Sequence, residues 1–273
     1  MQSRFIRYKA SVIHFFVFGN GPGYLFCLHG FGQSGSSFQI FEKELAENYT
    51  LFAMDFPFHG KTEWKEGLLM TPDDLLAILA IIMNENIGTV KNHPTFSVLA
   101  YSLGGRIALH LLQKVLAKIE KLVLVAPDGL TVNFWYWLGT QTWAGNKLFA
   151  YTMKKPYWFF TLLSAAYKLG LLNKSIIKFV HLNIDDENTR LVLYKRWTTL
   201  RRFTPNRRTI KRIMKEKQIK VCLVFGSYDR IILSKRSNFL KKNNEQLSVT
   251  VVEGGHELLK EKFSQTIALL LQQ

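Results

Sequence analysis

The sequence predicts an α/β fold: a mostly parallel central sheet with helices on both faces and an inserted helical cap. Short apolar runs alternate with segments of helical period from residue 24 to about residue 127. This pattern is typical of strand–helix–strand units around a sheet that is buried on both faces. Residues 130–215 are helical in period, rich in aromatic residues and without the alternation, which resumes after residue 220. We therefore expect a sheet domain made of residues 1–129 and 216–273, interrupted by a cap at residues 130–215.

The apolar runs give the expected strands, which lie at residues 24–28, 50–54, 96–101, 122–126, 221–225 and 247–252. The run at residues 11–18 is also expected to be a strand. It belongs to an N-terminal hairpin whose turn is the sequence NGPG at residues 20–23, because Gly and Pro favour turns.

Two segments before residue 90 carry helix signals. In the first, Phe38, Phe41 and Leu45 fall on one face, and Ser36 or Ser37 is available as a cap. The second begins with TPDD at residues 71–74, where Thr can cap, Pro takes the first helical position and two carboxylates meet the positive end of the helix dipole. Gly88 is its expected end, and a last helix is expected from about Lys260.

Composition bounds the class of protein. The chain has 273 residues, of which 48% are hydrophobic and 21% charged, so it can bury a sizeable core and is not disordered. Cys27 and Cys222 both lie in apolar runs, which excludes a disulfide framework and a cysteine zinc site. No metal-binding or phosphate-loop motif is present, so we expect neither a metal nor a nucleotide cofactor.

The chain is strongly basic, and the charge is uneven. The formal net charge is +16, and residues 130–215 hold sixteen Lys and Arg against three acidic residues. Arg201, Arg202, Arg207 and Arg208 are the densest part of this stretch. Such a stretch fits an anionic substrate group, peripheral contact with an anionic membrane surface, or simply a solvated face. Specific nucleic-acid binding is disfavoured because no recognition motif accompanies the charge.

The N-terminus is basic and is followed by a short apolar run that His14 interrupts. This run lacks a small-residue cleavage site, so we interpret it as a strand and expect a cytoplasmic protein. The longest uncharged stretch, residues 129–146, contains polar residues and is at the lower limit for a membrane span.

One segment predicts the chemistry. Residues 96–106, FSVLAYSLGGR, form an apolar strand that runs into Ser102 and then directly into a helical run. Ala100 and Gly104, two positions before and after the serine, are small, as a sharp strand-to-helix turn requires. Such a turn exposes the serine hydroxyl at a helix N-terminus, where backbone N–H groups favour a developing negative charge.

Further motifs make the sequence resemble the α/β-hydrolase superfamily. They are LHGFGQSG at residues 28–35, similar to the family's oxyanion loop, and DFPFHGKT at residues 55–62, where Phe58 stands at a common glycine position. FGSYD at residues 225–229 is similar to the family's acid turn, and VEGGH at residues 252–256 ends in its histidine position. The resemblance covers residues 5–129 and 216–273 but not the insertion.

The resemblance implies a triad in the family's chain order: Ser102 as nucleophile, Asp229 as acid and His256 as base. It also implies an oxyanion hole made by the backbone N–H groups of Phe31 and Leu103. A rival acid is Asp128, which follows the next strand after the strand-to-helix turn at Ser102.

The other histidines have less specific interpretations. His29 and His59 each precede a glycine in a loop, so packing or substrate contact is favoured over base catalysis. His14, His93, His110 and His181 show no partner at a recognisable spacing.

These observations lead to one expected function, with alternatives. We expect a serine hydrolase that cleaves a small-molecule acyl ester or thioester through an acyl-enzyme on Ser102. Trp135, Trp137 and Trp143 would surround an apolar acyl group, and Arg201 and Arg202 would hold an anionic group beside it. The alternatives are a carbon–carbon bond hydrolase or lyase with the same site, and a hydrolase-like ligand-binding protein without efficient turnover.

Overall fold

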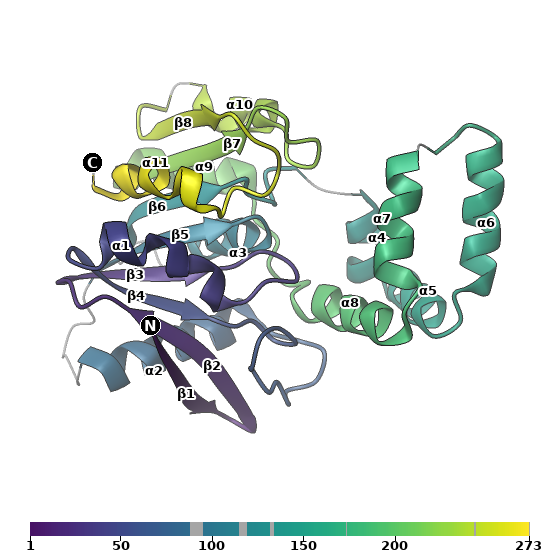
Figure 1. The fold of residues 1–273 in the computed structure, drawn as a ribbon, viewed down its shortest axis with the longest axis horizontal. Helices are drawn as coiled ribbons and strands as arrows, with labels where there is room; N and C mark the ends of the chain where they lie inside the picture. Colours follow the sequence, from purple (N-terminus) through teal and green to yellow (C-terminus); the bar gives the residue numbers. More distant parts are fainter. Residues whose placement is uncertain (88–94, 115–118, 132–133, 173, 243, 273) are drawn as a thin grey trace. The chain divides into compact units, whose positions relative to one another are not determined.

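The computed structural model describes residues 1–87, 95–114, 119–131, 134–172, 174–242 and 244–272. Within them lies an eight-stranded sheet of order β1-β2-β4-β3-β5-β6-β7-β8 (Figure 1). The strands are β1 (Gln2–Tyr8), β2 (Ser11–Phe18), β3 (Gly23–Leu28), β4 (Tyr49–Met54), β5 (Phe96–Tyr101), β6 (Ile119–Val125), β7 (Lys220–Gly226) and β8 (Leu247–Val252). β2 is antiparallel to β1 and to β4, and all other neighbouring pairs are parallel. The predicted mostly parallel α/β sheet is confirmed.

The N-terminal hairpin turns at Lys9 and Ala10, so the prediction of a turn at residues 20–23 was wrong. Tyr8 pairs with Ser11, and Lys9 has a φ of +53°, which suits a two-residue hairpin turn. The NGPG segment instead connects β2 to β3, and β4 lies between these two strands in the sheet. The sequence signal identified a turn correctly, but a turn does not require the strands on either side of it to pair.

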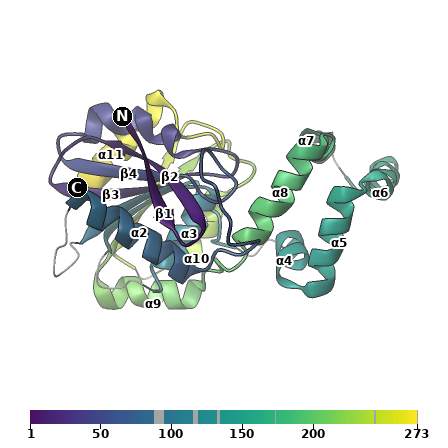
Figure 2. The same cartoon turned by 90° about the horizontal axis from the view of Figure 1, so that it is seen from below.

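Helices cover both faces of the sheet (Figures 1 and 2). One face carries the 3-10 helix η1 (Gly35–Phe41) with α1 (Glu42–Leu45) and α11 (Glu261–Gln272), whose apolar side chains join the sheet in one buried cluster. The other face carries α2 (Pro72–Ile87), α3 (Leu103–Leu111) and α9 (Arg207–Lys217). The remaining short elements of this unit are η2 (Ser234–Ser237) and α10 (Asn238–Lys241).

The first predicted helix has the expected apolar face but a different start. Phe38, Phe41 and Leu45 are fully buried, while Ser36 and Ser37 lie inside η1 and therefore do not cap it. The predicted caps were wrong because the chain enters this segment as a 3-10 helix that begins at Gly35, before either serine.

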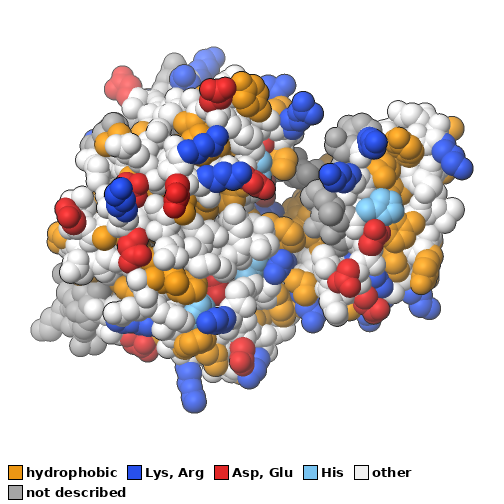
Figure 3. Space-filling view, viewed as in Figure 1, with side chains coloured by type: hydrophobic (Ala, Val, Ile, Leu, Met, Phe, Trp, Pro, Cys, Tyr) orange, Lys and Arg blue, Asp and Glu red, His pale blue; other side chains and the backbone are white. Residues whose placement is uncertain are grey.

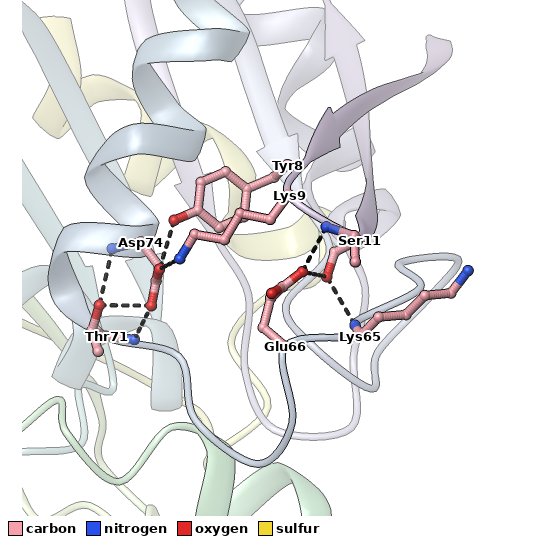
Figure 4. A network of polar contacts seen from close by, with 8 residues as sticks. Tyr8, Lys9, Ser11, Lys65, Glu66, Thr71 and Asp74 are labelled. Carbon is pink, nitrogen blue, oxygen red and sulfur yellow. Dashed lines mark hydrogen bonds and ion pairs between the residues drawn. The ribbon is translucent and has the colours of Figure 1, made fainter.

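The start of α2 is tied to the N-terminal hairpin by a polar network (Figure 4). Thr71 and Asp74 form the predicted cap: the Thr71 hydroxyl accepts from the Asp74 N–H at 3.1 Å, and the Asp74 carboxylate accepts from the Thr71 N–H at 2.8 Å. Tyr8 and Lys9 donate to the same carboxylate at 2.6 and 2.7 Å. α2 ends at Ile87, and the predicted stop at Gly88 lies outside the described residues.

The chain divides into two compact units. The first comprises residues 1–66, 71–131 and 203–273, and the second comprises residues 67–70 and 132–202. The second unit is helical, with α4 (Phe134–Gln141), α5 (Trp143–Lys154), α6 (Tyr157–Lys168), α7 (Lys174–Ile184) and α8 (Glu187–Thr199). Residues 203–215, which the sequence analysis assigned to the insertion, belong to the sheet unit because Ile210, Ile213 and Met214 of α9 are buried there.

Across the described parts of the chain, no helix combines the length and the apolar character needed to span a bilayer.

Candidate active site

Ser102 lies at a strained turn between β5 and α3. Its φ of +48° and ψ of −111° are rarely adopted by a residue with a side chain. The backbone around it is tightly hydrogen-bonded: the Ser102 N–H donates to the Val125 carbonyl at 3.0 Å, and the Ser102 carbonyl accepts from Gly105 and Asp128 at 2.9 Å. The predicted strand–turn–helix arrangement is therefore present at this serine.

The small residue after the serine is a steric requirement. A Cβ atom added at Gly104 would lie 1.9 Å from the Leu28 carbonyl oxygen at the end of β3. This close approach of backbone to backbone brings the first turn of α3 against the start of the 28–35 loop. Any side chain at position 104 would force the two segments apart.

Ser102, His256 and Asp229 form a continuous chain of hydrogen bonds. The Ser102 Oγ lies 3.0 Å from Nε2 of His256, and Nδ1 of His256 lies 2.8 Å from Oδ2 of Asp229. The three residues come from the ends of β5, β8 and β7, which lie at the same edge of the sheet because these strands are parallel. The Asp229 side chain is fully buried, whereas His256 keeps 19% of its side chain exposed.

Asp229 is fixed by its own loop. Its other oxygen, Oδ1, accepts from the N–H groups of Ile231 and Ile232 at 2.8 and 2.9 Å. Asp128, the rival acid, lies elsewhere: it accepts from the Gly129 N–H at 2.7 Å and pairs with Arg106 at 3.6 Å. Of the two carboxylates, the structure places Asp229 beside the histidine.

Tyr101 supports His256 and was not identified from the sequence. Its hydroxyl donates to the His256 carbonyl at 3.0 Å, and the two rings pack with centroids 5.5 Å apart. Burial raises the pKa of Tyr101, and the negative charges of Glu257 and Asp229 raise it further, so the hydroxyl remains a donor. The residue before a nucleophile reads as ordinary strand core, so sequence alone gave no signal for this contact.

The expected oxyanion donors lie on the two segments that Gly104 brings together. Leu103 is the first residue of α3, and its N–H has no partner within the helix because the first N–H groups of any helix have none. Phe31 lies in the turn after β3, in which the Gln33 N–H donates to the Gly30 carbonyl at 3.2 Å. Their joint role as an oxyanion hole stays a prediction.

His29 and His59 hold loops in place. The fully buried His29 accepts from the Phe56 N–H at Nε2, at 3.1 Å, and contacts its neighbour's carbonyl oxygen through Nδ1 at 2.8 Å. His59 contacts the Pro57 carbonyl through Nδ1 at 2.9 Å. Both are buried, in agreement with the packing role that the sequence favoured.

The loop at residues 55–62 explains why glycine is common at two of its positions. Phe58 has a φ of +62°, a left-handed conformation that favours glycine. Gly60 has a φ of +50°, and a Cβ atom there would lie 1.7 Å from the Asp55 carboxylate. Asp55 is fully buried and organises the loop by accepting from the Lys61 N–H at 2.9 Å.

Three of the four histidines that the sequence left without partners have them. His14 contacts Ser3 and Asp55, and His181 contacts Asp185 one helical turn away. Burial lowers the pKa of His110, whose Nδ1 accepts from the Thr204 N–H at 3.1 Å. His93 lies outside the described residues. The His14 contacts cross between strands, and sequence spacing cannot reveal them.

The predicted aromatic side chains lie in the second unit and are exposed. Trp135 and Trp143 are 75% and 74% exposed, and Trp137 is 43% exposed. Lys147 lies over the Trp143 ring at 3.9 Å. On the face seen in Figure 3, hydrophobic side chains gather over this unit with lysines and arginines among them. This unit therefore presents apolar and cationic surface together.

The predicted arginine cluster is divided between the two units. Arg201 and Arg202 belong to the helical unit, and Arg207 and Arg208 begin α9 in the sheet unit. The Arg201 guanidinium donates to the carbonyls of Leu68 and Thr198 at 2.6 and 2.7 Å. Both acceptors belong to the helical unit, so these hydrogen bonds lie within it. Arg207 donates to the Leu130 carbonyl at 3.2 Å and stacks on Phe239. Arg202 and Arg208 are exposed.

Within the described residues, no group of three or more His, Cys, Asp and Glu side chains is arranged to hold a metal ion.

The fold and this edge of the sheet define an α/β-hydrolase arrangement, and comparison with known proteins agrees. The family model described as the alpha/beta hydrolase fold matches residues 23–263. The chain belongs to this family.

Among curated proteins, the chain is similar to the pimeloyl-[acyl-carrier protein] methyl ester esterase of Vibrio parahaemolyticus, with 30% identity over 141 residues. That match covers 51% of this chain and 49% of the relative. The esterase of the same name from Aeromonas salmonicida is 31% identical over 40% of this chain and 39% of its own length. The chain thus spans about half the length, or less, of the curated relatives it matches.

Solved structures show the same fold along nearly the whole chain. An esterase from Thermogutta terrifontis has a TM-score of 0.68 at 15% identity, covering 100% of this chain and 98% of its own. An enol-lactonase from Burkholderia xenovorans has a TM-score of 0.65 at 13% identity, covering 99% and 100%. At these identities the likeness concerns the fold alone.

Proposed function

We propose that this protein is a serine hydrolase that cleaves an acyl ester or thioester through an acyl-enzyme on Ser102. The observation that carries the proposal is the hydrogen-bond chain from the Ser102 Oγ through His256 to Asp229, with distances of 3.0 and 2.8 Å. The order of contacts is the one that activates a serine: hydroxyl, imidazole, buried carboxylate.

The chemistry follows from the proton positions. Asp229 accepts from Nδ1 of His256, so the neutral ring keeps a lone pair on Nε2, which faces the hydroxyl. As the Ser102 Oγ bonds to the acyl carbon, its proton moves to Nε2, and the imidazolium is stabilised by Asp229. The same proton then passes to the leaving alkoxide or thiolate when the bond to the acyl carbon breaks. Water then attacks the acyl carbon and gives a proton to Nε2 of His256. This proton passes to the Ser102 Oγ as the acid is released.

The negative charge that develops on the acyl oxygen during acylation and deacylation needs hydrogen-bond donors. We assign this role to the N–H groups of Leu103 and Phe31, because Leu103 opens α3 and the two segments are in backbone contact at Gly104. Removing one such donor typically lowers kcat by about 10²–10³.

The acyl group is proposed to be apolar. This is supported by the exposed Trp135, Trp137 and Trp143, which offer flat apolar surface in the helical unit. The carrier-protein ester in the names of the curated relatives also fits an acyl substrate. Arg202 remains a proposed contact for an anionic group, whereas Arg201 is engaged with backbone carbonyls of its own unit.

Peripheral contact with an anionic membrane is proposed at α9 rather than at the helical unit. Six of the eleven residues of α9 are Lys or Arg. Arg207 and Lys211 both lie over the ring of Phe239, which is 38% exposed. A cationic helix beside an accessible aromatic ring suits a negatively charged lipid surface. The cytoplasmic location stays a prediction.

A panel of substrates tests the proposal. We expect p-nitrophenyl esters of graded chain length to give a burst of nitrophenol followed by slower turnover, with acyl-CoA thioesters cleaved at the same site. Turnover without a burst or covalent intermediate, on carbon–carbon substrates alone, would favour the lyase or carbon–carbon hydrolase alternative. Saturable ligand binding without turnover of any substrate would favour the binding protein.

A further inference from the structure

A second serine–histidine–aspartate chain lies at the N-terminal edge of the sheet. The Ser3 Oγ on β1 is 2.8 Å from Nε2 of His14 on β2, and Nδ1 of His14 is 2.6 Å from Oδ2 of Asp55, which follows β4. The atoms are connected in the same order as in Ser102, His256 and Asp229. The two series of hydrogen bonds share no residue.

The hydrogen bonds around Asp55 determine the tautomer of His14. The carboxylate also accepts from the backbone N–H groups of Gly35 and Lys61 at 2.7 and 2.9 Å, so both of its oxygens act as acceptors. Nδ1 of His14 must therefore carry a hydrogen, and the neutral ring has its lone pair on Nε2. The Ser3 hydroxyl donates to that lone pair. This is the proton arrangement that activates a serine.

The base is buried, whereas the nucleophile is exposed to solvent. The side chains of His14 and Asp55 are 0% and 1% exposed, while Ser3 is exposed. The imidazole is held between two aromatic rings, with centroids 4.8 Å from Phe5 and 4.6 Å from Phe16. The base is thus rigid and shielded from water, and the hydroxyl it contacts can be reached from solvent.

We propose that Ser3 is a second acyl-accepting serine, which reacts with small activated acyl donors such as aryl esters and acyl thioesters. The Ser3 Oγ bonds to the carbonyl carbon, and its proton moves to Nε2 of His14. The bond from that carbon to the aryloxide or thiolate breaks, and the leaving group takes the proton from His14. The products are O-acyl-Ser3 and the free phenol or thiol.

Ser3 lacks one feature of Ser102, and this sets the expected rate. It lies inside a strand, opposite Phe16 in the hairpin, and not at a helix N-terminus. Losing a single oxyanion donor lowers turnover by about 10²–10³ in serine hydrolases. We therefore expect Ser3 to acylate at least about 10²-fold more slowly than Ser102, so its product is best observed when Ser102 is absent.

The test uses the full chain carrying Ser102→Ala. The protein is incubated with p-nitrophenyl acetate, digested, and examined by mass spectrometry for acetyl groups that alkaline hydroxylamine removes, which distinguishes serine esters from lysine amides. Ser248 is the internal control because it is also an exposed serine on a strand at the opposite end of the strand order, and none of the described histidines contacts it. We expect Ser3 to be acetylated at least about tenfold faster than Ser248.

Two further variants test whether the label is on Ser3 and whether its rate depends on His14. Ser3→Ala should abolish the hydroxylamine-sensitive label near the N-terminus, and His14→Gln should reduce the Ser3 rate to that of Ser248, provided that circular dichroism shows a folded protein. If His14→Gln does not fold, the Ser3 to Ser248 ratio in the Ser102→Ala protein decides alone. Equal labelling of Ser3 and Ser248 would overturn the proposal and leave these contacts as an anchor for β1.

Discussion

Oδ2 of Asp229 accepts a hydrogen bond from Nδ1 of His256 at 2.8 Å, while the carboxylate of Asp128 pairs with Arg106 at 3.6 Å. The two acids follow neighbouring strands, β6 and β7, at the same edge of the sheet. Only Asp229 touches the histidine. This geometry distinguishes two positions that the sequence left as rivals.

Asp229→Asn should cripple turnover. An amide cannot stabilise the imidazolium and favours the wrong tautomer, which lowered kcat by about 10⁴ in the best-studied triad. Asp128→Asn is the matched control and should change kcat little. Steady-state kinetics on an activated ester compares the two, and a larger loss in the Asp128 variant would show that the acid has been assigned wrongly.

Gly104→Ala should destabilise the protein and remove its activity together. The added methyl group would lie 1.9 Å from the Leu28 carbonyl oxygen, and overpacking of this kind costs about 1–3 kcal/mol. Gly139→Ala in α4 is the control, since the atoms nearest to its Cβ would be those of Phe149 at 3.9 Å, an ordinary van der Waals distance. Its free energy of unfolding should stay constant or rise by about 0.5–1 kcal/mol. Thermal unfolding measures the stability of both variants. Equal stability would contradict the close approach of Gly104 to the Leu28 carbonyl oxygen.

Asp74→Asn should weaken the protein at neutral pH but not in acid. Burial opposes ionisation of Asp74, but hydrogen bonds from Lys9, Thr71 and Tyr8 outweigh it and hold its pKa well below the usual value. A carboxyl with a lowered folded-state pKa stabilises the protein above its unfolded pKa of about 3.9, and this contribution is lost as the pH falls below that value.

The expected difference in unfolding free energy between wild type and Asp74→Asn is about 1 kcal/mol near pH 7. It should shrink as the pH drops below about 4, where the carboxyl of the unfolded chain takes up a proton while that of the folded protein stays ionised. Urea unfolding across this range measures the difference. Asp73→Asn is the control, because its carboxylate is exposed and pairs only loosely with Lys114, at 3.4 Å. A pH-independent difference for Asp74→Asn would contradict the ionic origin.

The cations of α9 are expected to bind anionic vesicles. The triple change of Arg208, Lys215 and Lys217 to Gln should weaken binding to phosphatidylserine vesicles by about 1 kcal/mol per charge. The control changes Lys154, Lys155 and Lys168 of the helical unit, which removes the same net charge elsewhere. Sedimentation with vesicles compares the two variants. Equal weakening would mean that overall charge, and not α9, is responsible.

The centre of the sheet was predictable because strands such as β5, whose six residues are all buried, appear as separate apolar runs, whereas the polar and mostly exposed β1 gave no such run. β5 and β8 begin and end where the sequence analysis placed them. The strand-to-helix turn at the serine was also predictable from the sequence, since Ser102 and Gly104 lie within one local turn. Contacts between distant segments were not: Tyr101 with His256, and His14 with Ser3 and Asp55, depend on strand order and register. The hairpin turn at Lys9 was missed because its residues carry no turn signal.

The most direct test of the account is covalent labelling of Ser102. The protein is treated with a fluorophosphonate, and the modified peptide is identified by mass spectrometry, alongside the Ser102→Ala variant as control. We expect rapid modification of Ser102 in the wild type, with the rate falling sharply in His256→Gln and only slow labelling of any other serine in Ser102→Ala. Undiminished labelling of the Ser102→Ala protein would contradict the assignment of Ser102 as the nucleophile.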